Sequence, residues 1–132
     1  MAATFNFELV TPERLLMSGA AEQVVVPGSE GDFAVLAGHA PVISTLRPGI
    51  LEITLPQGRQ RVFVKQGVAE ADPGRLTVLA QSAVAVDELD ASRLAAELRA
   101  AEAELAQAKD DQSKRMAEML VDLLKRLQAK AA

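Results

Sequence analysis

Apolar and polar residues alternate along the first half of the chain in short runs. A period of two residues is typical of a strand with one face in a core. Two runs show it most clearly: Phe5, Phe7, Leu9 and then Leu51, Ile53, Leu55. We expect strands over residues 5–9, 33–36, 51–55, 61–64 and 76–79. Short strands separated by turns predict an antiparallel sandwich or barrel.

Turn signals separate these runs. Pro56-Gln57-Gly58 predicts a tight connection before the strand over residues 61–64. Asp72-Pro73-Gly74 predicts another, because proline fixes φ at the first central position and glycine accepts a positive φ at the next. We therefore expect a left-handed backbone at Gly74.

The second half of the chain has a different period. Apolar residues recur every three or four positions, which predicts amphipathic helices. The expected seams are Leu94, Leu98, Ala101, Leu105, Ala108 on the first helix and Met116, Leu120, Leu123, Leu127 on the second. The polar segment 109–113 between them is short, so the helices should be antiparallel neighbours. Asp87 or Asp90 can cap the first helix, and Asp110 or Asp111 the second.

Helix-breaking residues mark the boundary between the halves. All eight glycines and all six prolines lie between Pro12 and Gly74. Residues 88–132 contain neither and are rich in strong helix formers. We therefore predict an α+β chain, with an N-terminal antiparallel β-sandwich domain over 1–86 and a C-terminal antiparallel two-helix hairpin over 87–132. The Ala-rich seam buries little area, so the hairpin should need a docking surface to be stable.

Composition narrows the function. The chain has no cysteine and one histidine, which argues against disulfides and thiolate metal sites. A net charge of −4 argues against nucleic acid as a partner. The N-terminus lacks the pattern of a signal peptide, and no apolar run has the ~18 residues of a membrane span. We expect a soluble intracellular protein with no metal, no cofactor and no direct membrane insertion.

The single histidine lies in a turn-rich apolar stretch. Ser44, His39 and Asp32 could be imagined as a catalytic triad, but no nucleophile elbow accompanies them. The glycines around Ser29 lack the Lys-Ser/Thr of a phosphate-binding loop. The simplest interpretation of His39 is a loop residue whose ring binds a backbone group, and a functional role stays open as the alternative.

Residues 24–49, VVVPGSEGDFAVLAGHAPVISTLRPG, are very similar to the signature of the epsilon subunits of rotary ATP synthases, called delta in mitochondria. PGSEGDF, GHAP and LRPG occur in order and at the family's spacings. The later stretch QGVAEADPGRLTVLAQSA also resembles the family's last sandwich strands. The resemblance covers essentially the whole chain, departs mildly at Ala34 and Ala37, and implies a β-sandwich followed by a two-helix hairpin.

The resemblance implies a non-catalytic subunit of the proton-translocating ATP synthase. It would lie in the central stalk, couple the gamma subunit to the membrane rotor ring of c subunits, and sit peripherally on the cytoplasmic side of the bacterial inner membrane. Glu30 and Asp32 match positions that face the ring. His39, with Ala40 and Pro41, matches positions that face gamma. We expect Asp32 and His39 at the same end of the sandwich.

The resemblance also gives the hairpin a regulatory role. In several family members it meets the catalytic alpha and beta subunits and blocks ATP hydrolysis. The basic candidates here are Lys109, Lys114, Arg115, Lys125, Arg126 and Lys130. Residues 88–132 nevertheless hold nine acidic and eight basic side chains, so these lysines and arginines could equally form ordinary solvated helix pairs.

The segment Leu89–Leu94 resembles an ATP-binding motif found in some bacterial members. Asp90 and Arg93 are kept, Leu94 replaces a small residue, and Arg126 could approach from the second helix. Asp90 could instead cap the helix, and Arg93 could pair with Glu97. The alternative function is therefore a nucleotide-sensing module with ATP as regulatory ligand. A third hypothesis is that the chain is a free-standing β-sandwich adaptor from another complex.

Overall fold

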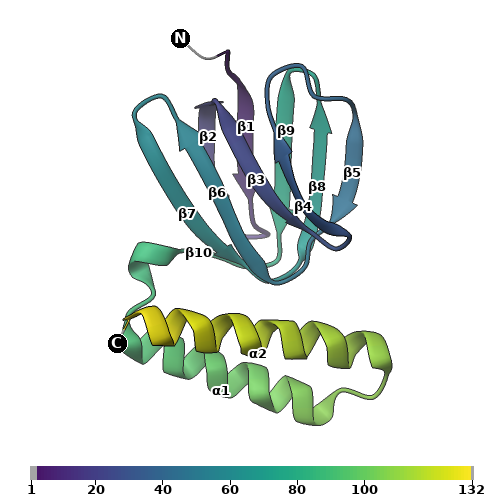
Figure 1. Ribbon diagram of the computed structural model, residues 1–132, viewed down its shortest axis with the longest axis vertical. Coiled ribbons are helices and arrows are strands. Elements are labelled where there is room, and N and C mark those ends of the chain that lie inside the picture. Colours follow the sequence, from purple (N-terminus) through teal and green to yellow (C-terminus); the bar gives the residue numbers. More distant parts are fainter. Residues whose placement is uncertain (1–2, 132) are drawn as a thin grey trace. The chain divides into compact units, whose positions relative to one another are not determined.

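The computed structural model describes residues 3–131, which form two compact units that divide between Ala85 and Val86 (Figure 1). The first unit contains the strands and the second contains the helices. The α+β class and the order of its parts are as predicted from the sequence. The division falls one residue before the predicted boundary at 86/87, and the independent folding of each domain stays a prediction.

The first unit is a sandwich of two five-stranded sheets. One sheet has the order β2-β1-β9-β8-β5, and the other has the order β10-β7-β6-β3-β4. The strands are β1 (Phe5–Val10), β2 (Leu15–Ala21), β3 (Gln23–Gly28), β4 (Gly31–Val35), β5 (Val42–Thr45), β6 (Gly49–Leu55), β7 (Gly58–Val64), β8 (Gly67–Asp72), β9 (Arg75–Ala80) and β10 (Ala83–Ala85).

One strand pair departs from the expected antiparallel arrangement. Strands β1 and β9 are parallel, with Phe7 opposite Leu76 and Leu9 opposite Val78. A parallel pair needs a long connection, because no tight hairpin can join its strands. The chain between β1 and β9 contains seven strands, so the rest of the domain supplies that connection.

The alternating apolar side chains form one core between the sheets. Phe5, Phe7 and Leu9 of β1 are almost fully buried, as are Leu51 and Ile53 of β6. Aliphatic side chains from both sheets complete the same cluster: Val24, Val26, Val35, Leu46, Val62, Val64, Leu76 and Val78, with small alanines at Ala21, Ala69, Ala71 and Ala80. Every member of this cluster lies in the first unit.

The turn between β8 and β9 forms where the sequence predicts it, but not by the predicted mechanism. The Asp72 carboxylate Oδ1 accepts a hydrogen bond from the Gly74 amide at 3.0 Å. The φ angle of Gly74 lies outside the left-handed region. The expectation of a positive φ at Gly74 is therefore wrong, because the side chain of Asp72 stabilises the turn with an ordinary backbone.

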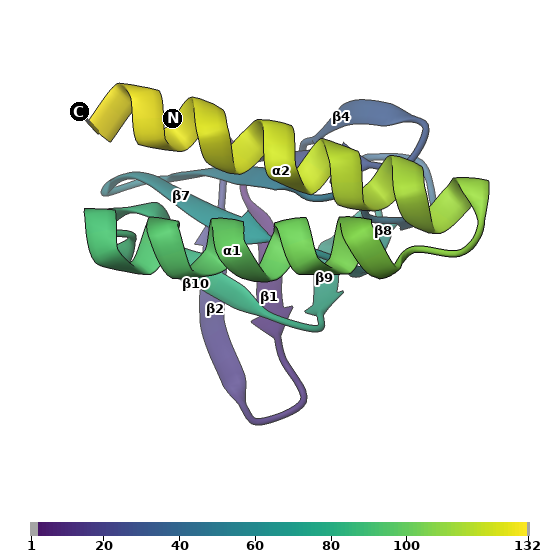
Figure 2. The same cartoon turned by 90° about the horizontal axis from the view of Figure 1, so that it is seen from below.

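The second unit contains a short 3-10 helix (Val86–Glu88) and two antiparallel helices, α1 (Ala91–Gln107) and α2 (Asp111–Ala131) (Figure 2). Of the four possible caps, the structure selects Asp90 and Asp110. Asp90 Oδ1 accepts from the Arg93 amide at 2.8 Å, and Asp110 Oδ1 accepts from the Ser113 amide at 2.7 Å. Neither helix in the described part of the chain combines the length and hydropathy that crossing a membrane requires.

The buried face of α2 differs from the predicted seam. Leu120 is buried as expected, but the other buried side chains are Ala117, Val121 and Leu124. The predicted Met116, Leu123 and Leu127 are only half-buried. Two apolar stripes share Leu120 on this helix. The prediction followed the stripe with more large side chains, but the other stripe is the buried one. On α1, Leu94 and Ala101 are buried as predicted.

Candidate interaction site

The signature stretch 24–49 includes strand β5 and contributes loops at both ends of that strand. At the C-terminal end of β5, the Ser29 amide in the β3–β4 turn donates to the Thr45 carbonyl at 2.8 Å. At the other end, the Gly38 amide donates to the Pro73 carbonyl at 2.8 Å. The three residue steps of β5 span about 10 Å.

Asp32 and His39 therefore do not share an end of the sandwich, and that expectation is wrong. Asp32 lies at the start of β4, beside the β3–β4 turn. The chain then runs along β4 to the loop that carries His39, and β5 brings it back toward the turn (Figure 1). Only seven positions separate the two residues in the sequence, but an extended strand carries the chain across the sheet between them.

The two acidic candidates of the β3–β4 turn differ in their contacts. An oxygen of Asp32, Oδ1, is paired with Arg47 Nη2 at 2.5 Å. Glu30 is exposed at the tip of the turn. Both side chains are exposed, 59 % for Asp32, so the two carboxylates differ in that only Asp32 is paired within residues 3–131.

The loop before β5 contains the three predicted gamma-facing residues. His39 is half-buried, and its ring Nδ1 donates to the Ala40 carbonyl at 2.6 Å. This contact agrees with the simplest interpretation of the histidine. In a neutral ring, this bond requires the proton on Nδ1. Nε2 is then the acceptor that a partner could contact. Ala40 and Pro41 are exposed.

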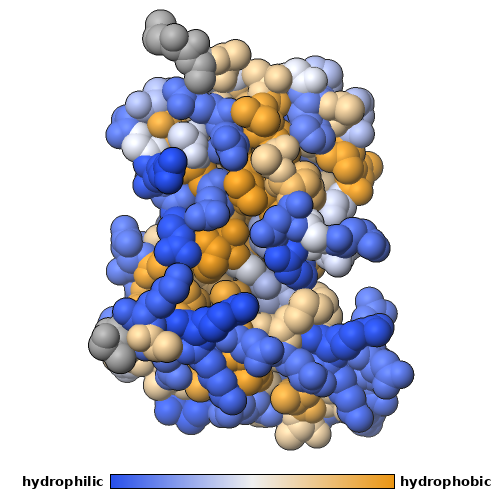
Figure 3. Space-filling view, in the orientation of Figure 1, coloured by the Kyte–Doolittle hydropathy of each residue, from blue (hydrophilic) through white to orange (hydrophobic). Residues whose placement is uncertain are grey.

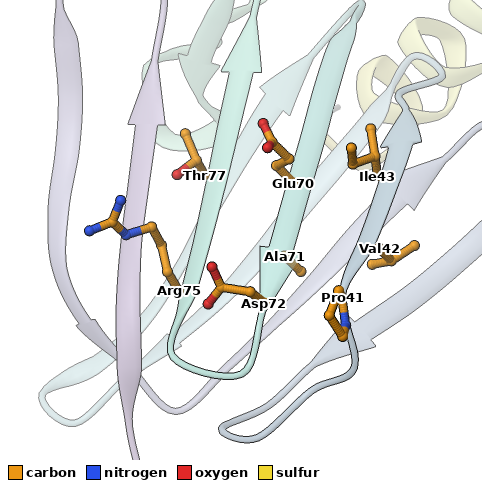
Figure 4. A pocket seen from close by; sticks show the side chains of 8 residues that line it. All are labelled: Pro41, Val42, Ile43, Glu70, Ala71, Asp72, Arg75 and Thr77. Atoms are coloured by element: carbon orange, nitrogen blue, oxygen red, sulfur yellow. The ribbon is translucent and has the colours of Figure 1, made fainter.

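An open pocket of ≈ 630 Å³ lies on the outer face of one sheet, beside edge strand β5. Pro41 contributes to its wall, so the pocket adjoins the His39 loop. Figure 4 shows Ile43, Glu70 and Thr77 on three neighbouring strands, with Asp72 and Arg75 in the next row. Its lining is therefore mixed, with an apolar rim at β5 and charged groups toward β9.

A row of apolar side chains crosses the same outer face. Register places Val68 opposite Leu79, Leu79 opposite Val10, and Val10 opposite Leu15. Leu79 is 46 % exposed and Leu15 is 53 % exposed, while Ile43 near the end of the row is 72 % exposed. We call Leu15, Val10, Leu79 and Val68 the outer row. The outer row is a candidate interface.

The outer row was missed in the sequence reasoning, although a signal for it exists. Strict alternation fails where apolar residues follow one another without a break, as in Val78-Leu79-Ala80. In a strand, successive side chains point to opposite faces, so one of two consecutive apolar residues must point away from the core. Such breaks at 9–10, 15–17 and 78–80 mark the outer row.

The candidate ATP-binding residues are engaged within the hairpin. Asp90 caps α1, and Arg93 Nε lies 3.6 Å from Glu97 Oε2. Arg126 is exposed on α2, toward the end of the hairpin that holds the start of α1, because the helices are antiparallel. The six basic candidates of the hairpin are all exposed, and hydrophilic side chains cover most of the hairpin surface visible in Figure 3.

The cap of α2 is also an electrostatic feature. The Ser113 backbone amide, with its side chain as a second donor, lowers the pKa of Asp110. A carboxyl with a lowered pKa in the folded state stabilises that state above its unfolded pKa, and this contribution disappears as pH falls through the lowered value. The start of α2 should therefore loosen only in acid. Among the described residues, no cluster of three or more acidic or histidine side chains could hold a metal ion.

The fold and these surfaces define a class of protein: a β-sandwich with a helical hairpin, whose candidate sites are interaction surfaces. Residues 4–86 match the family described as the beta-sandwich domain of the ATP synthase delta/epsilon chain. The chain therefore belongs to the delta/epsilon family of ATP synthase subunits.

Individual relatives agree with the family match. The ATP synthase epsilon chain of Parvibaculum lavamentivorans is 51% identical over 96% of this chain and 97% of its own length. Among solved structures, a chain of the Euglena gracilis mitochondrial ATP synthase assembly of OSCP, F1 and c-ring matches with a TM-score of 0.75 and 25% identity, covering 100% of this chain and 84% of that one. A chain from the central stalk and c-ring of the Tetrahymena thermophila enzyme has the same fold, with a TM-score of 0.69 at 12% identity over 96% and 98% of the two chains.

Proposed function

We propose that this chain is a non-catalytic rotor subunit of a proton-translocating ATP synthase, which couples the gamma subunit to the ring of c subunits. The observation that carries the proposal is the outer row on a chain of this family. The outer face of an antiparallel sheet is ordinarily polar when it faces water. A contiguous exposed apolar patch marks a protein interaction site instead.

The gamma subunit is the partner proposed for this face. The outer row would supply the apolar centre of the interface, and the charged pocket residues Asp72 and Arg75 its polar rim, the usual anatomy of a protein interface. Pro41 lines the pocket, and His39 and Ala40 come directly before it in the same loop. The polar loops of the c ring are the partner proposed for the opposite end of β5, where Glu30 and Asp32 lie. We further propose that the subunit lies peripherally, on the cytoplasmic side of the bacterial inner membrane.

A sandwich is suited to this mechanical role. Its two sheets share one close-packed core, and such interiors have low compressibility and transmit strain. A force applied at the gamma-facing sheet would therefore reach the ring-facing turn without being absorbed by deformation. The chain needs no catalytic group for such a role, and the histidine serves recognition.

His39→Ala is expected to weaken binding to isolated gamma by about 1–2 kcal/mol, the usual cost of truncating a contacting side chain. Calorimetric titration measures this change. Within residues 3–131, the His39 ring bonds only the neighbouring Ala40 carbonyl, so thermal unfolding of the free chain should be unaffected. His39→Gln, which keeps a side-chain donor, is the matched control. Unchanged affinity in His39→Ala would remove His39 from the interface, and a hydrolase activity that vanishes with it would overturn the mechanical role.

The hairpin is proposed to contact the catalytic alpha and beta subunits transiently and to limit ATP hydrolysis. Its exposed lysines and arginines support such a contact. The near-balanced charge of residues 88–132, nine acids against eight bases, means that attraction must come from particular side chains and not from a general field.

A nucleotide-sensing role is the second candidate, and the contacts of Asp90 and Arg93 weigh against it. ATP would have to replace the Arg93–Glu97 pair, and a base bonded to Asp90 would compete with the helix cap. Binding is therefore expected to be no tighter than the high micromolar to millimolar range, roughly 4–5 kcal/mol. Calorimetric titration of ATP into the wild type and Arg93→Ala tests this. A submicromolar dissociation constant that is lost in Arg93→Ala would establish the sensor role instead.

A further inference from the structure

Arg47 fastens the β3–β4 turn through three separate contacts. Its guanidinium Nη1 donates to the Gly28 carbonyl at 2.7 Å, and its Nη2 pairs with Asp32 Oδ1 at 2.5 Å. Its backbone amide donates to the Pro27 carbonyl at 3.0 Å. One planar side chain thus grips the last residue of β3 and the second residue of β4. The rigid fork of donors makes arginine suited to such a two-point contact.

The opposite side of the turn is fastened by Ser29. Its hydroxyl lies 2.7 Å from the Thr45 hydroxyl, in addition to the bond between the Ser29 amide and the Thr45 carbonyl. These contacts join β3 and β4 of one sheet to β5 of the other. The end of β5 lies beside this turn in Figure 1. The turn is therefore held from both sheets of the sandwich.

Gly28 and Gly31 let the turn pack this closely. A Cβ atom at Gly28 would lie 2.8 Å from the Gly31 carbonyl oxygen and 2.9 Å from the Phe33 ring. Gly31 has a φ of +134°, which disfavours other residues. The backbone around Glu30 is thus fixed before any partner binds.

The contacts divide the two carboxylates by role. Arg47 balances the charge of Asp32 and occupies one of its oxygens. Glu30 has no hydrogen bond or ion pair within residues 3–131, and its side chain is exposed. We infer that Arg47 is a positioning residue: it clamps the turn, takes Asp32 out of partner recognition, and leaves Glu30 as the carboxylate that this end of the sandwich presents to a cationic group. This inference rests on the proposed contact between the turn and the c ring.

Amide hydrogen exchange on the full chain tests the clamp by itself. In Arg47→Ala, the Ser29 amide is expected to exchange about tenfold faster, because local opening depends on the contacts that hold the segment. The amides of β9 should be unchanged, which separates a local effect from general loss of stability. Arg47→Lys keeps the charge without the fork and should give a smaller increase. Equal exchange at Ser29 in the wild type and Arg47→Ala would overturn the positioning role.

Binding to an ATP synthase depleted of this subunit tests the assignment of Glu30. At low salt, Glu30→Gln is expected to bind roughly five- to tenfold more weakly than the wild type, and the difference should shrink at high salt as exposed charges are screened. Asp32→Asn should stay within about twofold of the wild type. Arg47→Ala should also bind more weakly, with partial recovery in Arg47→Lys, an order that simple destabilisation of the core would not give.

The outcomes separate this inference from the proposed function. A larger loss in Asp32→Asn than in Glu30→Gln would overturn the assignment of Glu30 while leaving the stalk role in place. Failure of the wild-type chain to bind the depleted enzyme would overturn the proposed function, and the assignment of Glu30 with it. Hydrogen exchange would still decide the role of Arg47 in that case.

Discussion

Replacing Leu79 with aspartate is expected to weaken binding of the gamma subunit by on the order of 100-fold, about 3 kcal/mol, as for other central interface residues. Leu79 lies in the middle of the outer row, between Val68 and Val10. An aspartate there would have to lose its water without gaining a partner, a large cost for a charge. Calorimetric titration with isolated gamma measures the effect.

The free chain should tolerate this substitution, because the Leu79 side chain points away from the core and is 46 % exposed. Arg59→Asp, which places the same carboxylate at an exposed position in the other sheet, is the control and should bind gamma normally. Leu79→Ala should fall between the wild type and Leu79→Asp. Normal binding by Leu79→Asp in a folded chain would show that gamma does not use the outer row.

Phe7→Ala is expected to destabilise the sandwich by about 3–5 kcal/mol, the usual cost of removing a buried aromatic ring. Phe7 is 1 % exposed and belongs to a cluster confined to the first unit. The loss should therefore be the same in the full chain and in a fragment of residues 1–86. Urea unfolding of both forms measures it, and Phe7→Leu, which conserves most of the volume, should lose less.

The comparison also tests the domain boundary. If the core is independent, the 1–86 fragment unfolds in one cooperative transition. A fragment without such a transition, or a markedly different loss from Phe7→Ala in the two forms, would mean that sandwich and hairpin share a core. Either result would contradict the predicted division of the chain.

Local sequence patterns predicted most of the fold. Alternation placed Phe5, Phe7 and Leu9 in the core, and the distribution of glycine and proline separated strands from helices. The parallel pairing of β1 with β9 could not be predicted, because no local pattern encodes which distant strands become neighbours. The face of α2 was also missed, since overlapping apolar stripes give one helix two plausible seams.

The candidate site was harder to predict from the sequence than the fold. Asp32 and His39 were expected at the same end of the sandwich, but β4 carries the chain from one end to the other between them. The pair between Asp32 and Arg47 joins residues 15 apart, and nothing local in the sequence indicates it. The caps at Asp90 and Asp110 could be predicted, because each cap bonds an amide only three residues later in the sequence. The structure was needed to choose between the candidate aspartates at each helix.

Proton-driven ATP synthesis in vesicles tests the central claim most directly. The complete enzyme is compared with an enzyme assembled without this chain, and hydrolysis by the catalytic subunits is measured alongside. If the chain couples gamma to the c ring, the depleted enzyme should still hydrolyse ATP but lose most proton-driven synthesis, and adding the purified chain back should restore synthesis. Undiminished synthesis in the depleted enzyme would contradict the coupling role.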